Sequence, residues 1–397
     1  MSNLISDRIN NMSYSKTFVM SNKARELKAQ GVDVITLTLG EPDFEIPEFI
    51  KQAAIQAIND GYNSYSPVPG FLELRKAIAH KFKRDNNLTY QNDEIVVSTG
   101  GKQSIMNVLF SVVNEGDEVI IPAPYWVSYV EMVKIAGGES VIIETGIDNE
   151  FKMTAEQLEK AITPKTKALL YSSPCNPSGS VYNKEELQEI AKVIAKYPQI
   201  TIISDEIYEY MNYEGKHESI GQFPEVFNQT ATINGMSKAF AMTGWRLGYM
   251  GAPKWLADAC DKIQGQITSG TNCITQICSI PGLMAEPKVI DYMIDAFKER
   301  REIVYNLMKE IPGFKANKPK GAFYFFPDIS YYFGKEVAGM KINDADDFAM
   351  LLLEKAHVGT VGGVSFGDPA CVRFSYAAAE KDLIEAMQRI KELLKDY

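Results

Sequence analysis

The sequence predicts an α/β protein with a large domain, built on a mostly parallel seven-stranded sheet, and a smaller α+β domain. Through the middle of the chain, short runs rich in Val, Ile and Tyr alternate with amphipathic helical patterns. This alternation is typical of a parallel sheet covered by helices on both faces. A Pro-Gly pair at 312–313 ends a long helical pattern, and shorter strands follow it. We therefore expect a large domain at 46–310 and a small domain formed by 1–45 and 311–397.

Each strand of the large domain is predicted from a short apolar run that ends at a polar or turn-forming residue. The expected strands are Glu94–Ser98, Glu118–Ile121, Ser140–Ile143, Ala168–Ser172, Thr201–Ser204, Thr230–Asn234 and Arg246–Met250. A helix at Gln103–Val113 follows a Gly-Gly pair. Two further helices begin with the spacing of a capping box, at Thr154–Gln157 and at Asn183–Glu186.

The two ends of the chain give the elements of the small domain. A helix is expected at 17–30 and a strand at Val34–Leu39, before a helix that Pro47 opens and Gly61 closes. Near the C-terminus the expected strands are Ala322–Phe326, Val358–Val361 and Cys371–Tyr376, and the expected helices lie near 343–355 and 380–395.

Composition excludes several classes of protein. The chain of 397 residues has 41 Lys plus Arg against 51 Asp plus Glu, a net charge of −10 that argues against nucleic acid as the main partner. No apolar run approaches the roughly 20 residues that cross a bilayer, and no signal peptide is visible. Five scattered Cys without a CxxC pair, together with three His, argue against a metal site and favour a reducing cytoplasm. The cysteines are expected to be small apolar fillers, and His80 and His217 to be exposed.

The densest candidate segment is Asn234–Arg246, where Lys238 follows a strand beside Ser237 and eight residues before Arg246. Partial burial and neighbouring cations lower the pKa of a lysine, which makes the neutral amine available as a nucleophile. A lone lysine is usually just solvated. The flanking groups favour a lysine that links to an aldehyde, with Ser237 and Arg246 on a phosphate.

Three further candidates lie where strands end. The Gly-Gly pair at Gly101 opens a helix whose free N–H groups suit a phosphate, although a plain turn explains it equally well. Asp205 suits a protonated ring nitrogen, which makes a pyridine an electron sink, or else caps the next turn. Tyr208 would donate to a phenolate oxygen of the same ring, and Asn176 offers an amide to it.

The remaining candidates suit a substrate or a ring face. Arg373 lies in an apolar strand and needs an anionic partner, either a substrate carboxylate or an internal Asp or Glu. Trp126 would stack on an aromatic ring or belong to the core. Gly40 allows close approach of a substrate carboxylate, and Tyr65 lies in a loop from which it would reach a phosphate.

Taken together, these segments resemble the class I aminotransferases, pyridoxal-phosphate enzymes of fold type I, over essentially the whole chain. The matching motifs are Leu39–Phe44, Tyr65, Thr99–Gln103, Pro124–Trp126, Asn176–Gly179, Asp205–Tyr208, Ser237–Arg246 and Arg373–Ser375. The resemblance departs at Gly235, where many relatives have a phosphate-binding Ser, and at Ser178, which replaces the commoner Thr.

The resemblance implies a role for each candidate. Lys238 would carry the cofactor and then move the proton at the substrate Cα, while Asp205 holds the ring nitrogen. Tyr208 and Asn176 would contact the ring oxygen. Trp126 would cover the ring, and the groups around the phosphate would be Gly101, Lys102, Ser237 and Arg246. Tyr65 would reach the neighbouring subunit's phosphate, which implies a homodimer with shared sites. The substrate carboxylate would be held by Arg373, Asn176, Trp126 and Gly40.

The subgroup follows from the same resemblance. Lys102, Ser15 and Thr17 resemble the bacterial subgroup that reads acidic side chains through a lysine, which implies a ping-pong aminotransferase for aspartate and 2-oxoglutarate. Members that aminate prephenate usually carry a basic residue near Ser13, and its absence at this position makes prephenate a less favoured substrate. An aromatic or broad-specificity aminotransferase and a C–S β-lyase remain alternatives. A ligand-sensing regulator is disfavoured, because no segment is spare for a DNA-binding domain.

Overall fold

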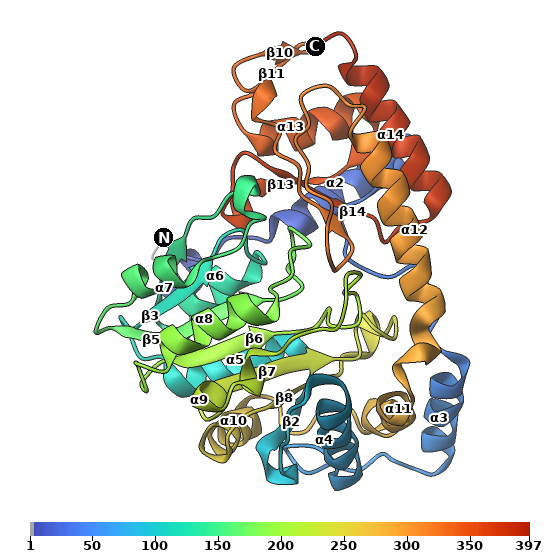
Figure 1. Cartoon of the computed structure of the whole chain (residues 1–397). Coiled ribbons are helices and arrows are strands. Elements are labelled where there is room, and N and C mark those ends of the chain that lie inside the picture. The colour runs from blue at the N-terminus through green and yellow to red at the C-terminus, as the bar shows by residue number, and fades with distance from the viewer. Residues whose placement is uncertain (1–3) are drawn as a thin grey trace.

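The computed structural model describes residues 4–397 and contains a seven-stranded sheet in the order β2-β8-β7-β6-β5-β3-β4 (Figure 1). The strands are β2 (Ile95–Ser98), β3 (Glu118–Pro122), β4 (Glu139–Ile143), β5 (Thr166–Ser172), β6 (Thr201–Asp205), β7 (Thr230–Gly235) and β8 (Gly248–Gly251). β8 runs antiparallel to both of its neighbours, and the other pairs are parallel. The predicted fold class is therefore confirmed.

Burial on both faces explains why these strands are almost continuously apolar. On β3, Val119 and Ile121 belong to one core cluster and Ile120 to another, because successive side chains point to opposite faces. The first cluster includes side chains of α5 (Gly101–Val112), α6 (Ser128–Ala136) and α10 (Lys254–Ile267). The second includes side chains of α7 (Ala155–Ala161) and α8 (Lys184–Ile194).

Both predicted capping boxes form. The Thr154 hydroxyl accepts from the Gln157 N–H at 3.2 Å, and the Asn183 side chain accepts from the Glu186 N–H at 2.8 Å. Each cap satisfies an N–H group that a helix start leaves without an intrahelical partner. The helices α7 and α8 therefore begin where their sequence signals place them.

Other helices surround the sheet at the end where β2 lies. α3 (Glu48–Asn59), α4 (Leu72–Asn86) and α11 (Cys273–Met284) pack together there, and the short α9 (Pro224–Phe227) precedes β7. The 3₁₀ turns are Asn92–Glu94, Ile147–Asn149, Ile220–Gln222, Thr243–Trp245, Pro287–Ile290, Ser330–Tyr332 and Gly363–Phe366. Arg246 lies before β8, with a φ of 57°, so its expected place inside that strand is wrong.

Three small sheets lie outside the seven-stranded sheet, and one of them joins the N-terminal segment to the C-terminal part of the chain. β1 (Ile35–Thr36) pairs with β12 (Val358–Gly359), β10 (Glu336–Val337) pairs with β11 (Met340–Lys341), and β14 (Val372–Ser375) lies between β13 (Val361–Gly362) and β9 (Tyr324–Phe325). The accompanying helices are α1 (Asp7–Asn10), α2 (Lys16–Ala29), α12 (Asp291–Met308), α13 (Ala345–Leu351), the π-helix Leu352–Ala356 and α14 (Glu380–Leu394). Pairing of β1 with β12 brings part of the N-terminal segment against the C-terminal part of the chain, and the division into 46–310 and 1–45 with 311–397 stays a proposal.

Figure 1 shows α12 running from beside α11 to the region of α14, against which it packs. Within residues 4–397, the structure has no helix of the length and hydrophobicity needed to span a membrane.

Candidate active site

Lys238 follows β7 and is partly buried. Its Nζ donates to the Gly40 carbonyl oxygen at 2.7 Å, which joins the N-terminal segment to the sheet edge. The pKa of Lys238 is lowered to about 8, mainly by burial; the charge of Glu41 opposes the shift, and the charges of Arg373 and Arg246 contribute to it. A substantial fraction of the amine is therefore neutral near physiological pH, as a lysine nucleophile requires.

Asp205 is the last residue of β6 and is buried. One carboxylate oxygen, Oδ2, accepts from the Tyr129 hydroxyl at 2.6 Å. The other, Oδ1, accepts from the Ile207 N–H at a longer 3.3 Å, so the predicted turn-capping contact is also present. Burial raises the pKa of Asp205 to about 6, which indicates a carboxylate whose charge lacks a close cationic partner.

A pair of tyrosines closes one side of Lys238. The Tyr208 hydroxyl lies 2.8 Å from the Tyr324 hydroxyl, and the Lys238 Nζ lies 5.8 Å from the Tyr208 ring centroid. A Cβ at Gly40 would overlap the Tyr324 hydroxyl, so this position needs glycine. Tyr324 therefore explains the glycine at this position, and the predicted approach of a substrate carboxylate to Gly40 stays a prediction.

Arg373 on β14 is 2% exposed and lies between the rings of Tyr324 and Phe366, 4.8 and 4.9 Å from their centroids. Its Nη1 donates to the Asn176 Oδ1 at 3.0 Å, and its Nη2 donates to the Thr38 carbonyl oxygen. Across residues 4–397, Arg373 makes no ion pair, and its Nε has no hydrogen-bond partner. The alternative of an internal salt bridge is therefore wrong, and the buried cation suits an anionic ligand.

The residues predicted to bind a phosphate lie around the start of α5. Gly100 precedes the helix with a φ of 84°, and a Cβ there would collide with the Arg246 guanidinium. The Arg246 Nη1 donates to the Thr243 carbonyl oxygen at 2.8 Å. The backbone N–H groups of a helix start together with a neighbouring guanidinium form an anion site. Ser237 is buried in the same loop as Lys238.

A cavity of about 710 Å³ opens beside this end of the site. Its lining includes Lys102 and Arg246 from the sheet edge and Ser15 from the N-terminal segment. The Lys102 Nζ lies 4.6 Å from the Trp126 ring centroid. Burial lowers the pKa of Lys102, and the positive charge of Arg246 lowers it as well. Thr17 lies in the first turn of α2 and is partly buried.

Tyr65 is 99% exposed in the single chain, and this chain does not bring it into contact with the groups above. Its predicted contact with a neighbouring subunit therefore stays a prediction. By contrast, a series of contacts that includes Tyr324 connects five of the predicted residues: Lys238, Gly40, Tyr208, Arg373 and Asn176.

Two contributors were absent from the sequence prediction. Tyr129 lies three residues after Trp126, and the two rings meet edge to face at 5.6 Å. Tyr324 lies in the expected strand Ala322–Phe326, for which no polar role was predicted. The position of Tyr129 after Trp126 was the available signal, whereas nothing local in the sequence singled out Tyr324.

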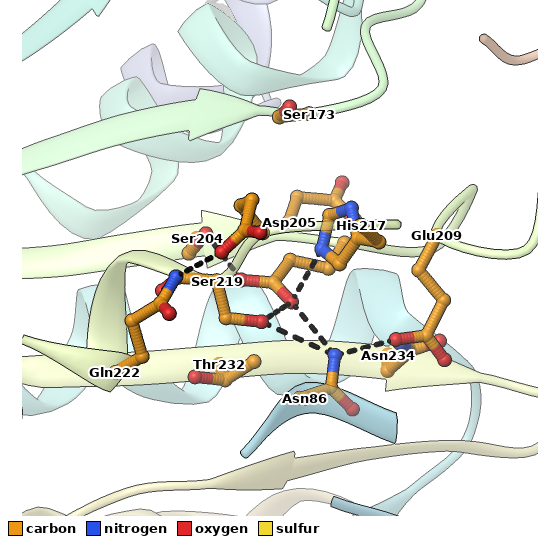
Figure 2. Close-up of polar contacts among 12 residues, drawn as sticks. Asn86, Ser173, Ser204, Asp205, Glu209, His217, Ser219, Gln222, Thr232 and Asn234 are labelled. Atoms are coloured by element: carbon orange, nitrogen blue, oxygen red, sulfur yellow. Dashed lines mark hydrogen bonds and ion pairs between the residues drawn. The ribbon is translucent and has the colours of Figure 1, made fainter. Parts of the chain in front are cut away.

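The expectation that His217 is exposed is wrong. It is 8% exposed, and its Nε2 lies 2.8 Å from the Glu206 Oε2. Figure 2 shows His217 beside Ser219 and Asn86, near Asp205. Glu206 also accepts from the hydroxyl of Ser219 and, at 3.0 Å, from that of Ser204. The stretch around His217 is polar and therefore resembled a surface loop. The partner that buries His217, the Glu206 carboxylate, lies eleven residues earlier, outside that stretch.

Carboxylate and imidazole atoms of Glu206, Glu209 and His217 lie within 4.8 Å of one another, as metal ligands would. The buried Lys81 ammonium contacts Glu209, and the Asn86 amide donates to Glu209 at 2.7 Å. Lys81 therefore supplies the positive charge that a buried acidic pair requires. We assign this cluster to the support of β6 and propose no metal there.

The chemistry of this donor set fits one kind of cofactor. It combines a lysine amine of lowered pKa, a buried carboxylate, a phenol pair and an anion site at a helix start. Such a set suits a phosphorylated aldehyde on a nitrogen heterocycle. Residues 32–390 match the family model described as aminotransferase class I and II. The chain belongs to this family. It is a pyridoxal-phosphate-dependent aminotransferase.

Relatives match along the full length. The chain is 45% identical over 395 residues to a bifunctional aspartate aminotransferase and glutamate/aspartate-prephenate aminotransferase of Petunia hybrida, covering 98% of this chain and 82% of the relative. It is 45% identical over 391 residues to a probable aspartate/prephenate aminotransferase of Rickettsia felis, covering 98% and 96%.

Two solved structures are also similar. The aspartate aminotransferase from Rhizobium meliloti superposes with a TM-score of 0.96 at 40% identity, covering 99% of both chains. The aspartate aminotransferase from Thermus thermophilus with maleate superposes with a TM-score of 0.93 at 40% identity, covering 99% of this chain and 100% of that one.

Proposed function

We propose that this aminotransferase transfers the amino group of L-aspartate to 2-oxoglutarate by a ping-pong mechanism. The observation that carries the proposal is a pair of cations without acidic partners. Arg373 makes no ion pair within residues 4–397, and Lys102 contacts the Trp126 ring rather than a carboxylate. Two such cations suit the two carboxylates of aspartate. The similar Thermus protein was solved with maleate, a four-carbon dicarboxylate, which supports this substrate class.

Each side chain has a proposed task that follows from its surroundings. Pyridoxal phosphate, when bound, supplies an electron sink that acidifies the substrate Cα–H. Lys238 would hold the cofactor and move the proton at Cα, since its pKa of about 8 leaves a substantial fraction of the amine neutral near that pH. Arg373, held by Asn176, orients the substrate α-carboxylate. Asp205 pairs with the protonated ring nitrogen, and Tyr208 donates to the ring oxygen.

The other predicted residues complete this proposal. Trp126 covers the ring face, and Gly101, Lys102, Ser237 and Arg246 surround the phosphate. Ser15, which lines the cavity, and Thr17, in the first turn of α2, would border the substrate side chain, and Gly40 would admit the α-carboxylate. Tyr65, fully exposed here, reaches the phosphate of a second copy, so the active form is a homodimer. We place the enzyme in the cytoplasm.

An absorption spectrum tests the reaction, the cofactor and the substrate together. Protein supplied with pyridoxal phosphate should show a visible band that shifts to shorter wavelength on addition of aspartate. Addition of 2-oxoglutarate should restore the band. Protein that binds pyridoxal phosphate and responds to phenylalanine but not to aspartate would contradict the substrate assignment. A panel that follows keto-acid and ammonia release would separate aminotransfer from a C–S lyase reaction.

Prephenate amination is a second candidate, because the similar proteins of Petunia hybrida and Rickettsia felis carry it in their names. The surroundings of Ser13 argue against it. The Ser13 N–H donates to the Glu131 carboxylate at 3.2 Å, and the Lys16 ammonium lies 3.2 Å from Asp346. In the part of the chain described, the segment around Ser13 therefore contributes no unpaired cation to this side of the cavity. We predict a kcat/KM for prephenate well below that for 2-oxoglutarate, measured with aspartate as donor.

A further inference from the structure

Tyr129 is the side chain that holds the carboxylate of Asp205. Its hydroxyl donates to the Asp205 Oδ2 at 2.6 Å, the short distance of a hydrogen bond to a charged acceptor. Tyr129 is 1% exposed, and its hydroxyl points from α6 to the end of β6. Across residues 4–397 it is the one side chain that donates a hydrogen bond to Asp205, whose other donor is the backbone of Ile207.

The helix that carries Tyr129 makes a second contribution to the same site. The Tyr129 N–H donates to the Trp126 carbonyl oxygen at 2.9 Å, and the rings of the two residues are in edge contact. The start of α6 therefore brings together the residue expected to cover the cofactor ring and the residue that orients the carboxylate for its nitrogen. Rotation or displacement of this turn would alter both.

The charges around Asp205 indicate that the hydrogen bond from Tyr129 does more than support packing. Burial and the nearby Glu206 charge both favour the protonated form of Asp205, which cannot pair with a protonated ring nitrogen. A phenol stabilises the ionised carboxylate without adding a positive charge. It thereby keeps the carboxylate negative, and the second oxygen, which accepts only the longer 3.3 Å hydrogen bond from the Ile207 N–H, retains a lone pair for an ion pair with another group.

We propose that Tyr129 is a positioning residue that keeps the Asp205 carboxylate ionised and oriented for the ring nitrogen of pyridoxal phosphate. The proposal rests on the role proposed for Asp205. The competing interpretation is a core tyrosine whose hydroxyl has found a polar partner. The two differ in what the hydroxyl does for cofactor binding in a chain that is otherwise folded.

The first experiment compares two tyrosine-to-phenylalanine variants in cofactor-free protein. Tyr171→Phe is the matched control, because Tyr171 is buried on β5 and its hydroxyl contacts Ser204, next to Asp205, at 3.1 Å. The affinity for pyridoxal phosphate is measured by absorbance titration. We expect Tyr129→Phe to weaken binding about tenfold or more, the effect of one charge-assisted hydrogen bond, and Tyr171→Phe to change it less than about twofold. Equal affinities for the two variants would overturn the proposal.

The second experiment removes the group through which Tyr129 is proposed to act. In an Asp205→Ala background, Tyr129→Phe should cause no further loss of cofactor affinity, because coupled residues are not additive. A full additional loss would show that Tyr129 acts by packing. A wild-type protein that fails to bind pyridoxal phosphate would instead overturn the proposed function, which keeps the two failures distinct.

A third variant covers the case in which Tyr129→Phe does not fold. Replacement of Tyr129 by 3-fluorotyrosine keeps the shape and gives a more acidic, stronger donor. We expect its cofactor affinity to persist to lower pH than in wild type, and an unchanged pH profile would overturn the proposal. Asp205 is also faced by Glu206, Lys238, Tyr208 and Cys175, which are the same in both proteins, so the difference reports on position 129.

Discussion

The Arg373 guanidinium donates to the Asn176 amide oxygen at 3.0 Å, across 197 positions of the sequence. This contact joins β14, near the C-terminus, to the loop that follows β5 in the central sheet. The Thr38 carbonyl oxygen accepts from the same guanidinium, so the N-terminal segment also meets there. The site thus depends on three separated segments being held together.

Replacement of Arg373 should weaken aspartate binding and leave the protein folded. Arg373→Ala should raise the KM for aspartate about 10- to 100-fold, because a buried charge-assisted grip is lost. Arg373→Lys should recover only part of it, since lysine lacks the two-pronged geometry. Arg389→Ala is the control, because Arg389 is an arginine paired with Asp33 and Glu385 at the surface. Steady-state kinetics with an unchanged KM for Arg373→Ala would contradict the role.

Lys238→Ala should abolish turnover and leave the protein folded. The lowered pKa of about 8 predicts a second result in cofactor-free wild type. The rate at which pyridoxal phosphate becomes covalently attached should rise about tenfold per pH unit below pH 8 and level off above it, as the amine loses its proton. The visible band follows this rate. Full activity in Lys238→Ala would exclude this lysine as the catalytic base.

Lys102→Ala should impair dicarboxylic substrates more than aromatic ones. Loss of one hydrogen-bonded charge predicts a decrease of about 10- to 100-fold in kcat/KM for aspartate, with a smaller change for phenylalanine. Lys16→Ala is the control, since Lys16 lines the same cavity but is paired with Asp346. An equal loss for both substrates would assign Lys102 to the phosphate alone.

Asp205→Asn should stabilise the cofactor-free protein above pH 6. Burial raises the pKa of Asp205 from 3.8 to about 6, so the folded state binds more protons than the unfolded state between these values. Stability contributed by this group is therefore present at low pH and lost as the pH rises through about 6. Asp205→Asn removes a cost of up to about 3 kcal/mol at pH 8 and only a small fraction of it near pH 4. Denaturant unfolding at the two pH values measures it, with the exposed Asp295→Asn as control.

Mixing two inactive variants tests the shared sites. Tyr65→Ala and Lys238→Ala place their defects on different segments, and each homodimer should be nearly inactive. If Tyr65 acts across the interface, a hybrid dimer contains one intact site, and random exchange of subunits should restore about a quarter of wild-type activity. No recovery after verified subunit exchange would place Tyr65 and Lys238 in the same subunit's site.

Local sequence signals were sufficient for the sheet and the capping boxes, and they also singled out Lys238 as the candidate nucleophile. The strands are continuous apolar runs because both faces of the sheet are covered, as the opposite clusters of Val119 and Ile120 show. Helix starts at Thr154 and Asn183 depend on side chains three residues away. A lysine placed after a strand and flanked by Ser237 and Arg246 is distinctive within thirteen residues, Asn234–Arg246.

Tertiary structure decided which polar groups are partners. Arg373 proved to have no acidic partner within 4–397, His217 proved to be buried against Glu206, and Tyr324 proved to occupy the space above Gly40. The hydroxyl of Tyr129 reaches a carboxylate 76 positions away. Periodicity and spacing describe a residue's neighbours along one element. Desolvation and hydrogen bonding depend on atoms that different elements bring together, and those determine the charge states on which the chemistry rests.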